Sequence, residues 1–284
     1  MKSVVDSLKE MSEEIKSDIE TLLLNYTTIH SDRVFSSSGD HYWGSLSREG
    51  NGIQSKVLET YQQFSHLVNM LIIKQSQDVA GIYYAHDMKI KQIIEQKGNT
   101  WYKTPPDVLT AATETMDKYV GLLEELYDPS DGRAIYVPDT NALVYNPELE
   151  KWRFPDAQLF KIFLIPLILF ELDTIRDKHE NEMLREKAES LIGKIKGFRS
   201  RGRLTDGVPL VEGISEIVAG ALEPDFENTL PWLNVENSDD RILASFIEII
   251  RLHPHSPVVL VTCDINLQNK AEFARLQFEE PPAL

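Results

Sequence analysis

The sequence predicts a two-part protein, with an all-helical N-terminal domain over residues 1–130 and an α/β domain with a mostly parallel sheet over residues 131–284. In the first part, apolar residues recur at steps of three and four, which is typical of packed helices. In the second part, short β-rich runs alternate with helical patterns, which favours a parallel sheet. Residues 128–132 read Asp-Pro-Ser-Asp-Gly, a turn-forming segment that marks the boundary.

Composition restricts the classes of function. The chain has 284 residues, 42 % of them hydrophobic, and 29 basic against 45 acidic residues give a formal charge of −16. Such a charge opposes non-specific binding to nucleic acid and to anionic membranes, so any nucleic-acid site must be local. The longest apolar stretch, residues 162–170, is much shorter than the roughly 20 residues that cross a bilayer. We therefore expect a cytoplasmic protein with no membrane association.

In the N-terminal domain, the pattern predicts a helix over residues 4–22 and two or three antiparallel helices over residues 53–96. A Ser- and Gly-rich loop is expected over residues 31–52. A further helix is expected to begin at Thr104, with Pro105 in its first turn. The pattern of this domain names no ligand, and we expect it to serve as a surface for a protein partner.

In the C-terminal domain, buried strands are expected at residues 135–137, 161–165, 208–211 and 258–261. Helices are expected after Pro166, through the polar segment ending near residue 197, and over residues 239–252. The single cysteine, Cys263, excludes an internal disulfide. Because it follows an apolar strand, we expect a buried and inert thiol.

Acidic residues end, open or follow four of these elements. They are Asp139, Glu171, Asp239 and Asp264. In a parallel sheet they reach the same edge, where the crowding of carboxylates is costly unless a divalent cation neutralises them. Oxygen ligands without Cys or His select Mg²⁺ or Mn²⁺. The alternative interpretation is that these acids are separate helix caps.

Four segments around these acids resemble, in order, the motifs of PIN-domain nucleases. They are VPDTNALV at residues 137–144, IPLILFELD at 165–173, SDDRIL at 238–243 and VTCDINL at 261–267. The resemblance spans residues 134–281 and leaves the N-terminal domain uncovered. It implies a three-layer PIN-like α/β fold around a central parallel sheet. It also implies metal-dependent cleavage of single-stranded RNA, with Mg²⁺ or Mn²⁺ as cofactor and metal-activated water as nucleophile.

The resemblance also implies roles for individual residues. The metal-binding acids of the family fall on Asp139, Glu171, Asp239 and Asp264. In the third motif, Asp240 fits the spacing to an apolar residue as well as Asp239 does, so both stay candidate ligands, and Asp173 is a reserve for Glu171. Polar support for the acids is expected from Thr140, Asn141 and Thr262.

A basic stretch stands out in this acidic chain. Five cations lie within ten residues and are interleaved with Gly and Ser; they are Lys194, Lys196, Arg199, Arg201 and Arg203. Flexible backbone with exposed guanidinium groups suits contact with phosphates. The end of a solvated helix, where cations favour the helix dipole, explains the stretch equally well.

The leading hypothesis is therefore a metal-dependent endoribonuclease. A structure-specific DNA nuclease is the first alternative, because nothing in these residues separates ribose from deoxyribose. A silent module that binds RNA or protein without cleavage is the second, although all four acids are present.

Overall fold

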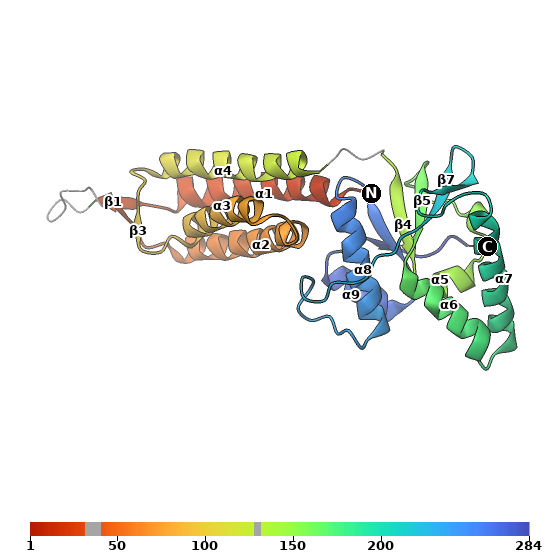
Figure 1. The fold of residues 1–284 in the computed structure, drawn as a ribbon. Coiled ribbons are helices and arrows are strands. Elements are labelled where there is room, and N and C mark those ends of the chain that lie inside the picture. The colour runs from red at the N-terminus through yellow and green to blue at the C-terminus, as the bar shows by residue number, and fades with distance from the viewer. Residues whose placement is uncertain (32–40, 128–131, 284) are drawn as a thin grey trace. The chain divides into compact units, whose positions relative to one another are not determined.

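The structure, a computed structural model, describes residues 1–31, 41–127 and 132–283. The chain divides into two compact units (Figure 1). One unit is Val4–Asp128, and the other combines Met1–Ser3 with Pro129–Leu284. The first residues group with the second unit because Gln277 Nε2 donates a 2.5 Å hydrogen bond to the carbonyl oxygen of Lys2. No described helix combines the length and apolarity that a bilayer span requires.

The helical unit is formed by long amphipathic helices that pack side by side. They are α1 (Val4–Asn25), α2 (Arg48–Ile72), α3 (Gln77–Glu95) and α4 (Pro105–Leu126). Helix α1 packs against α2 and α4, and α3 packs against the same two helices (Figure 1). The positions of the apolar repeat are buried, as in Leu8, Ile15 and Phe64. The expected start of α4 is also found, because Thr104 caps it with a capping box to Asp107.

A small antiparallel sheet in this unit was not predicted. Its strands are β1 (Ile29–Ser31), β2 (His41–Trp43) and β3 (Asn99–Thr100), in the order β1-β2-β3. The expected loop over residues 31–52 is wrong at its C-terminal end, because α2 begins at Arg48. Ser47 caps this helix by accepting from Gly50 N, so Gly50 and Gly52, which suggested a loop, lie in its first turns. Residues 32–40 of that loop lie outside the described residues.

The second unit contains a sheet of six mostly parallel strands flanked by helices, so the predicted fold class is confirmed. The strand order is β6-β7-β5-β4-β8-β9. The strands are β4 (Ala134–Pro138), β5 (Phe160–Leu164), β6 (Val208–Val211), β7 (Ser215–Ala219), β8 (Val258–Val261) and β9 (Phe278–Glu279). The central strands β4 and β8 are buried at every position, as expected for strands covered on both faces.

Two details of the sheet differ from the expectation. The strand at residues 208–211 is an antiparallel edge strand, paired with the unpredicted β7 rather than inserted in parallel. Pro209 has no N–H to donate and is tolerated at such an edge. Gly213, with φ of +71°, lies in the tight turn between the two strands. Strand β7 was not predicted because Ser215 and Glu216 make its first half polar, and only Ser215 and Ile217 are buried.

Helices cover both faces of this sheet (Figure 1). Helices α8 (Ser238–Leu252) and α9 (Ile265–Phe273) lie on one side of β4. Helices α6 (Pro166–Lys178) and α7 (Glu182–Arg199) lie on the other, with the short α5 (Thr140–Tyr145) and a 3₁₀ turn, η1 (Leu149–Lys151). Strands β4, β5 and β8 each lead directly into a helix or its cap, so their carboxyl ends carry polar residues along one edge.

Candidate active site

Asp139 lies where the buried strand β4 ends and α5 begins. It is the cap of α5, and its Oδ1 accepts a 2.6 Å hydrogen bond from Ala142 N. Its backbone N donates to the carbonyl oxygen of Val261 at 2.9 Å, which keeps the ends of β4 and β8 level. The residue is only 3 % exposed. A carboxylate is thus held at the centre of the sheet edge.

The end of β8 supplies the second acid and a hydroxyl. Thr262 Oγ1 donates a 2.5 Å hydrogen bond to Oδ2 of Asp139 and accepts one from Asp264 N at 2.9 Å. Asp264 caps α9, where its Oδ1 accepts from Asn266 N at 2.8 Å. Thr262 is fully buried and therefore fixes the spacing between the two acids.

Glu171 reaches the same edge from α6. Its Oε2 accepts a 2.5 Å hydrogen bond from the Thr140 hydroxyl, and its Oε1 accepts from the Ser238 hydroxyl. Ser238 is the first residue of α8, so two hydroxyls from two helix starts orient one carboxylate. The sequence analysis predicted Thr140 as polar support for the acids but did not predict a role for Ser238.

The structure separates Asp239 from Asp240. Asp240 is buried, and its Oδ2 accepts a hydrogen bond from Asn234 N at 2.9 Å while its Oδ1 pairs with Lys270 at 2.8 Å. Asp239 instead lines the cavity that the other three acids line, and its Oδ2 accepts from Asn266 Nδ2 at 2.8 Å. Successive helical residues point about 100° apart, so only one of the pair can face the cavity.

The four acids of the leading hypothesis line one cavity of about 350 Å³. Asp139, Glu171, Asp239 and Asp264 come from four elements and meet there, with the exposed side chain of Asn141 on the same wall. The reserve residue Asp173 does not line the cavity and pairs with Arg176 at 2.8 Å. It lies two residues from Glu171, which places it about 200° around the helix.

Burial and crowding change the acidity of the central carboxyl. The pKa of Asp139 is raised to about 6, mainly by burial. The charges of Asp264 and Glu171 also raise this pKa, whereas the hydrogen bonds from Thr262 and Ala142 lower it. Lys270 lies beside Asp239, with 3.4 Å between its Nζ and Oδ2 of that residue. Partial burial opposes its charge, but the hydrogen bond to Asp240 and the nearby Asp239 raise the pKa of Lys270.

The donor set fits a divalent cation. All four candidate ligands offer oxygens, and within the described residues Oδ2 of Asp264 and Oδ1 of Asp239 receive no hydrogen bond. Across the described ranges, no group of three or more His, Cys, Asp or Glu side chains lies close enough together, as the side chains stand, to hold a metal ion. Like charges repel, so hydroxyl and amide donors spread the carboxylates around the cavity. Oxygens of this kind and number suit Mg²⁺ or Mn²⁺.

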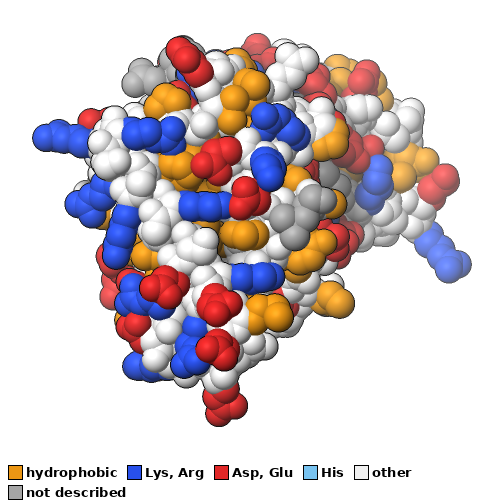
Figure 2. All heavy atoms as spheres, turned by 90° about the vertical axis from the view of Figure 1, so that its right-hand side faces the viewer, with side chains coloured by type: hydrophobic (Ala, Val, Ile, Leu, Met, Phe, Trp, Pro, Cys, Tyr) orange, Lys and Arg blue, Asp and Glu red, His pale blue; other side chains and the backbone are white. Residues whose placement is uncertain are grey.

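The basic stretch lies at the end of α7 and away from the acids. Lys194 pairs with Glu148, whereas the other four cations are exposed. The guanidinium of Arg201 lies 4.8 Å from the centre of the Phe198 ring. None of the five lines the acidic cavity. Figure 2 views the side on which α7 lies in Figure 1, and basic and acidic side chains are interleaved there rather than forming one basic surface.

Some residues at the site were missed or misjudged. Phe170, on α6, is 68 % exposed and lines both the acidic cavity and a neighbouring cavity of about 280 Å³. That second cavity contains Arg241, whose guanidinium has no ion pair among the described residues.

Cys263 is exposed rather than buried, because the chain leaves the sheet at the end of β8. The sulfur is still partly shielded from water, and this partial burial, together with the charge of Asp139, raises the pKa of the thiol.

A protein-family model described as "PIN domain" matches residues 136–281, just over half of the chain. The match begins within β4 and includes all four acids that line the cavity. No curated protein matches the chain.

Proposed function

The chain belongs to the PIN domain family, and we propose that it is a metal-dependent endoribonuclease that cleaves single-stranded RNA. PIN domains are generally nucleases and usually use divalent metals, so the family by itself suggests a nuclease-type function. The substrate and the cofactor are the parts that the proposal adds.

One observation carries the proposal: Asp139, Glu171, Asp239 and Asp264 line a single cavity at the carboxyl ends of the central strands. Isolated helix caps have no reason to share a cavity. Glu171 is no cap at all, since it lies in the second turn of α6 and is held by hydroxyls from two other elements. Crowding of carboxylates destabilises a fold, and it is typical of sites where the charges have a function.

Mg²⁺ or Mn²⁺ would be held by these four residues. When bound, the cation supplies the charge that neutralises the carboxylates and the phosphate, and it lowers the pKa of the attacking water. Support for this role comes from the four carboxylates in the lining of the cavity, and from the charges of Asp264 and Glu171, which add to the effect of burial in raising the pKa of Asp139.

The residues of the chain prepare the site for hydrolysis. Thr262 and Thr140 donate hydrogen bonds to Asp139 and Glu171, respectively, which orients the two carboxylates. The hydrogen bond from Thr262 also lowers the pKa of Asp139. In the reaction, the oxygen of water bonds to phosphorus, the ester P–O bond breaks, and the leaving oxygen takes a proton. Lys270, which pairs with Asp239 and Asp240, balances part of the negative charge of the site.

Phe170 supports a single-stranded substrate. Its exposed ring lies between the acidic cavity and the cavity with Arg241, so a nucleoside next to the cleaved phosphate can stack on the ring. The guanidinium of Arg241 then has a phosphate within reach. Bases in a duplex are already stacked and leave no face for such a contact. The basic stretch from Lys194 to Arg203 adds phosphate contacts farther along the strand.

The test is cleavage of labelled oligonucleotides with Mn²⁺. Single-stranded RNA, the same sequence as DNA, a duplex and a branched DNA flap are incubated with the wild-type chain and with Asp139→Asn. We expect cleavage of single-stranded RNA by the wild type only, and its loss when the cation is chelated. Cleavage of the flap alone would support a DNA nuclease instead. Binding of RNA without cleavage of any substrate would overturn the enzyme and favour a silent module.

A further inference from the structure

The helical unit has a cavity whose lining differs in charge and chemistry from the rest of this acidic chain. It has a volume of about 400 Å³ and lies where α3 meets the small sheet. Trp43, Trp101, Tyr102, Lys89 and Lys97 line it, together with amides from Gln92 and Asn99. Its described lining includes no Asp or Glu, although the chain carries 45 acids against 29 basic residues.

Trp101 is the most unusual member of this lining. Its side chain is 90 % exposed, whereas aromatic residues of this size normally bury most of their surface. The backbone beneath it is well held. Thr100 is buried in the strand β3, and its hydroxyl accepts a hydrogen bond from Tyr102 N at 3.3 Å. The indole is therefore presented to solvent from a fixed position.

The lysines of this cavity are available to an anion. Lys89 has no ion pair within the described ranges, and Lys97 pairs only with Glu95, at 3.2 Å, with 79 % of its side chain exposed. Exposed pairs of this kind contribute little stability and are readily exchanged for another partner. The cavity thus combines free aromatic faces with two positive charges.

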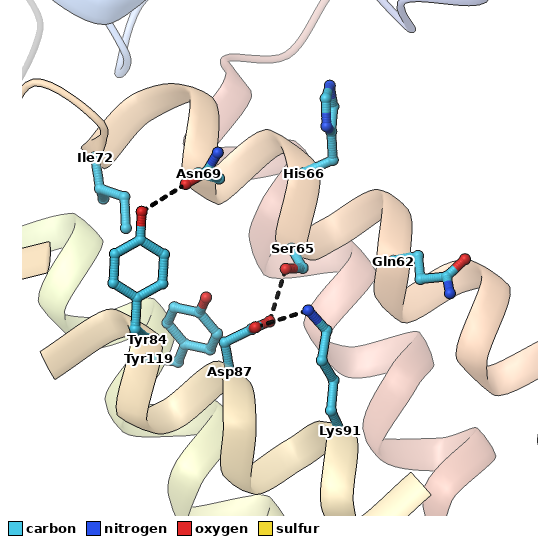
Figure 3. A pocket seen from close by; sticks show the side chains of 9 residues that line it. All are labelled: Gln62, Ser65, His66, Asn69, Ile72, Tyr84, Asp87, Lys91 and Tyr119. Carbon is cyan, nitrogen blue, oxygen red and sulfur yellow. Dashed lines mark hydrogen bonds and ion pairs between the residues drawn. The ribbon is translucent and has the colours of Figure 1, made fainter. Parts of the chain in front are cut away.

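Another cavity of the helical unit, shown in Figure 3, is different. It is lined by Tyr84, Asp87 and Lys91 among others, and has a volume of about 420 Å³. Asp87 already accepts hydrogen bonds from Ser65 at 2.6 Å and Lys91 at 2.8 Å (Figure 3). Lys91 is the only lysine of its described lining and is already paired with that carboxylate. This cavity therefore has no unpaired ammonium group for an anion among its described residues. Its polar groups stabilise the packing of α2 against α3.

We propose that the cavity of Trp43, Trp101, Tyr102, Lys89 and Lys97 binds a segment of single-stranded nucleic acid. Stacking of bases on aromatic rings and contact of lysines with phosphates are the two interactions that such a ligand makes. An acidic peptide would use the lysines but would leave the indole of Trp101 uncovered. The volume is in the range of sites that bind small ligands, which suits one or two nucleotides. The identification of the ligand as nucleic acid rests on the proposed nuclease function. The aromatic and basic character of the cavity is observed independently of that function.

The test measures binding by the full chain that carries Asp139→Asn, so that cleavage is excluded. The probes are a fluorescein-labelled 12-nucleotide single-stranded RNA and an abasic strand of the same length, followed by fluorescence anisotropy. We expect Trp101→Ala to weaken RNA binding about tenfold, the low end of the range for loss of one stacked base. Trp101→Phe should keep most of the affinity. The abasic strand should bind the parent and the Trp101→Ala variant equally, because it has no base to stack.

Charge is tested separately from stacking. Lys89→Gln with Lys97→Gln should reduce the slope of log affinity against log salt by about 0.7 per lysine. The matched control for Trp101→Ala is Tyr84→Ala. This variant also removes an exposed aromatic ring, but from α3 and from the other cavity of the unit. This control should leave RNA affinity unchanged. Melting curves should be equal for Trp101→Ala and its parent, because the removed side chain is exposed.

Three results would overturn the proposal: no RNA binding by the parent, equal affinity for parent and Trp101→Ala, or an effect of Tyr84→Ala as large as that of Trp101→Ala. A change of oligomeric state in Trp101→Ala, with unchanged RNA affinity, would assign the surface to protein contact instead. Failure of the nuclease hypothesis is distinguishable, because the wild type would then cleave nothing while Trp101-dependent binding could still be measured.

Discussion

The hydroxyl of Thr262, at the end of β8, donates a 2.5 Å hydrogen bond to Oδ2 of Asp139, at the end of β4. The two residues are 123 positions apart in the chain. The same hydroxyl oxygen accepts from the backbone N of Asp264. One buried hydroxyl therefore connects the first and the fourth acid of the cavity.

We expect Thr262→Val to lower cleavage about tenfold or more and to destabilise the fold by about 1–3 kcal/mol. Valine keeps the shape of threonine but leaves Oδ2 of Asp139 without its buried donor. The hydrogen bond also holds the pKa of Asp139 down, so its loss makes this carboxyl harder to ionise. Single-turnover cleavage and thermal melting measure the two effects. Thr262→Ser, which keeps the hydroxyl, should retain most of the cleavage activity and most of the stability. If Thr262→Val were as active as the wild type, the hydroxyl would not support Asp139 in catalysis.

Asp139→Asn should abolish cleavage and yet stabilise the metal-free fold at neutral pH. Burial raises the pKa of Asp139 from 3.8 to about 6, which at 1.36 kcal/mol per pKa unit corresponds to about 3 kcal/mol. The folded state thus prefers the protonated acid. Its stabilising contribution is complete below pH 3.8 and is lost as the pH rises through about 6.

Thermal melting without divalent cations, from pH 4.5 to 8, checks this sign. The melting temperature of Asp139→Asn should exceed that of the wild type, and this difference should increase as the pH rises. The matched control Asp173→Asn changes an exposed acid outside the cavity and should leave the profile unchanged. If this difference in melting temperature instead decreased with rising pH, the ionised form of Asp139 would stabilise the fold, which contradicts the prediction.

Phe170→Ala should raise the KM for single-stranded RNA about tenfold and change kcat less. The ring is 68 % exposed, so its removal costs little folding stability, whereas a stacked base is worth about 1–3 kcal/mol. Steady-state kinetics separates the two constants. Phe273→Ala, an exposed ring on α9 outside both cavities, is the control and should behave as the wild type. A fall in kcat at constant KM would place Phe170 in catalysis rather than binding.

Arg199, Arg201 and Arg203 changed together to Ala should weaken RNA binding and flatten its salt dependence. Each phosphate contact on a single strand contributes about 0.7 to the slope, so three contacts contribute about 2. The rate at saturating RNA should change less than the affinity, because none of the three lines the acidic cavity.

The control for this variant carries the same charge change elsewhere in the second unit, at Lys151, Lys178 and Arg185, all exposed. A general electrostatic effect would flatten the slope equally in both triple variants. In that case the basic stretch is a solvated helix end and no phosphate site.

Binding of Mn²⁺ should release protons and raise the melting temperature. The cation binds ionised carboxylates, and one of them is partly protonated near pH 6 in the free protein. The unfolded chain cannot assemble ligands that are so far apart in sequence, so binding stabilises only the folded state. Calorimetric titration in two buffers of different ionisation enthalpy measures the protons. No binding at millimolar Mn²⁺, with or without a non-cleavable RNA, would remove the metal from the proposal.

Local sequence patterns were sufficient to predict the long helices, the central strands and the acids at the strand ends. Strand β8 is four apolar β-branched or Leu residues in a row, and Thr104 with Asp107 is a complete capping box. Such signals depend on residues within about one helical turn or one strand, so they can be read without knowing the fold. The acids at strand ends follow from the same local patterns.

Which of these groups come into contact depends on the packing of helices and strands that are distant in the sequence. Asp239 and Asp240 have the same local spacing, and the packing of α8 turns one to the cavity and the other to Lys270. Ser238 reaches Glu171 across 67 residues, and the exposure of Trp101 depends on what the small sheet leaves uncovered. These relations are set by helix rotation and strand order, which depend on contacts between distant segments and leave no periodic trace in the chain.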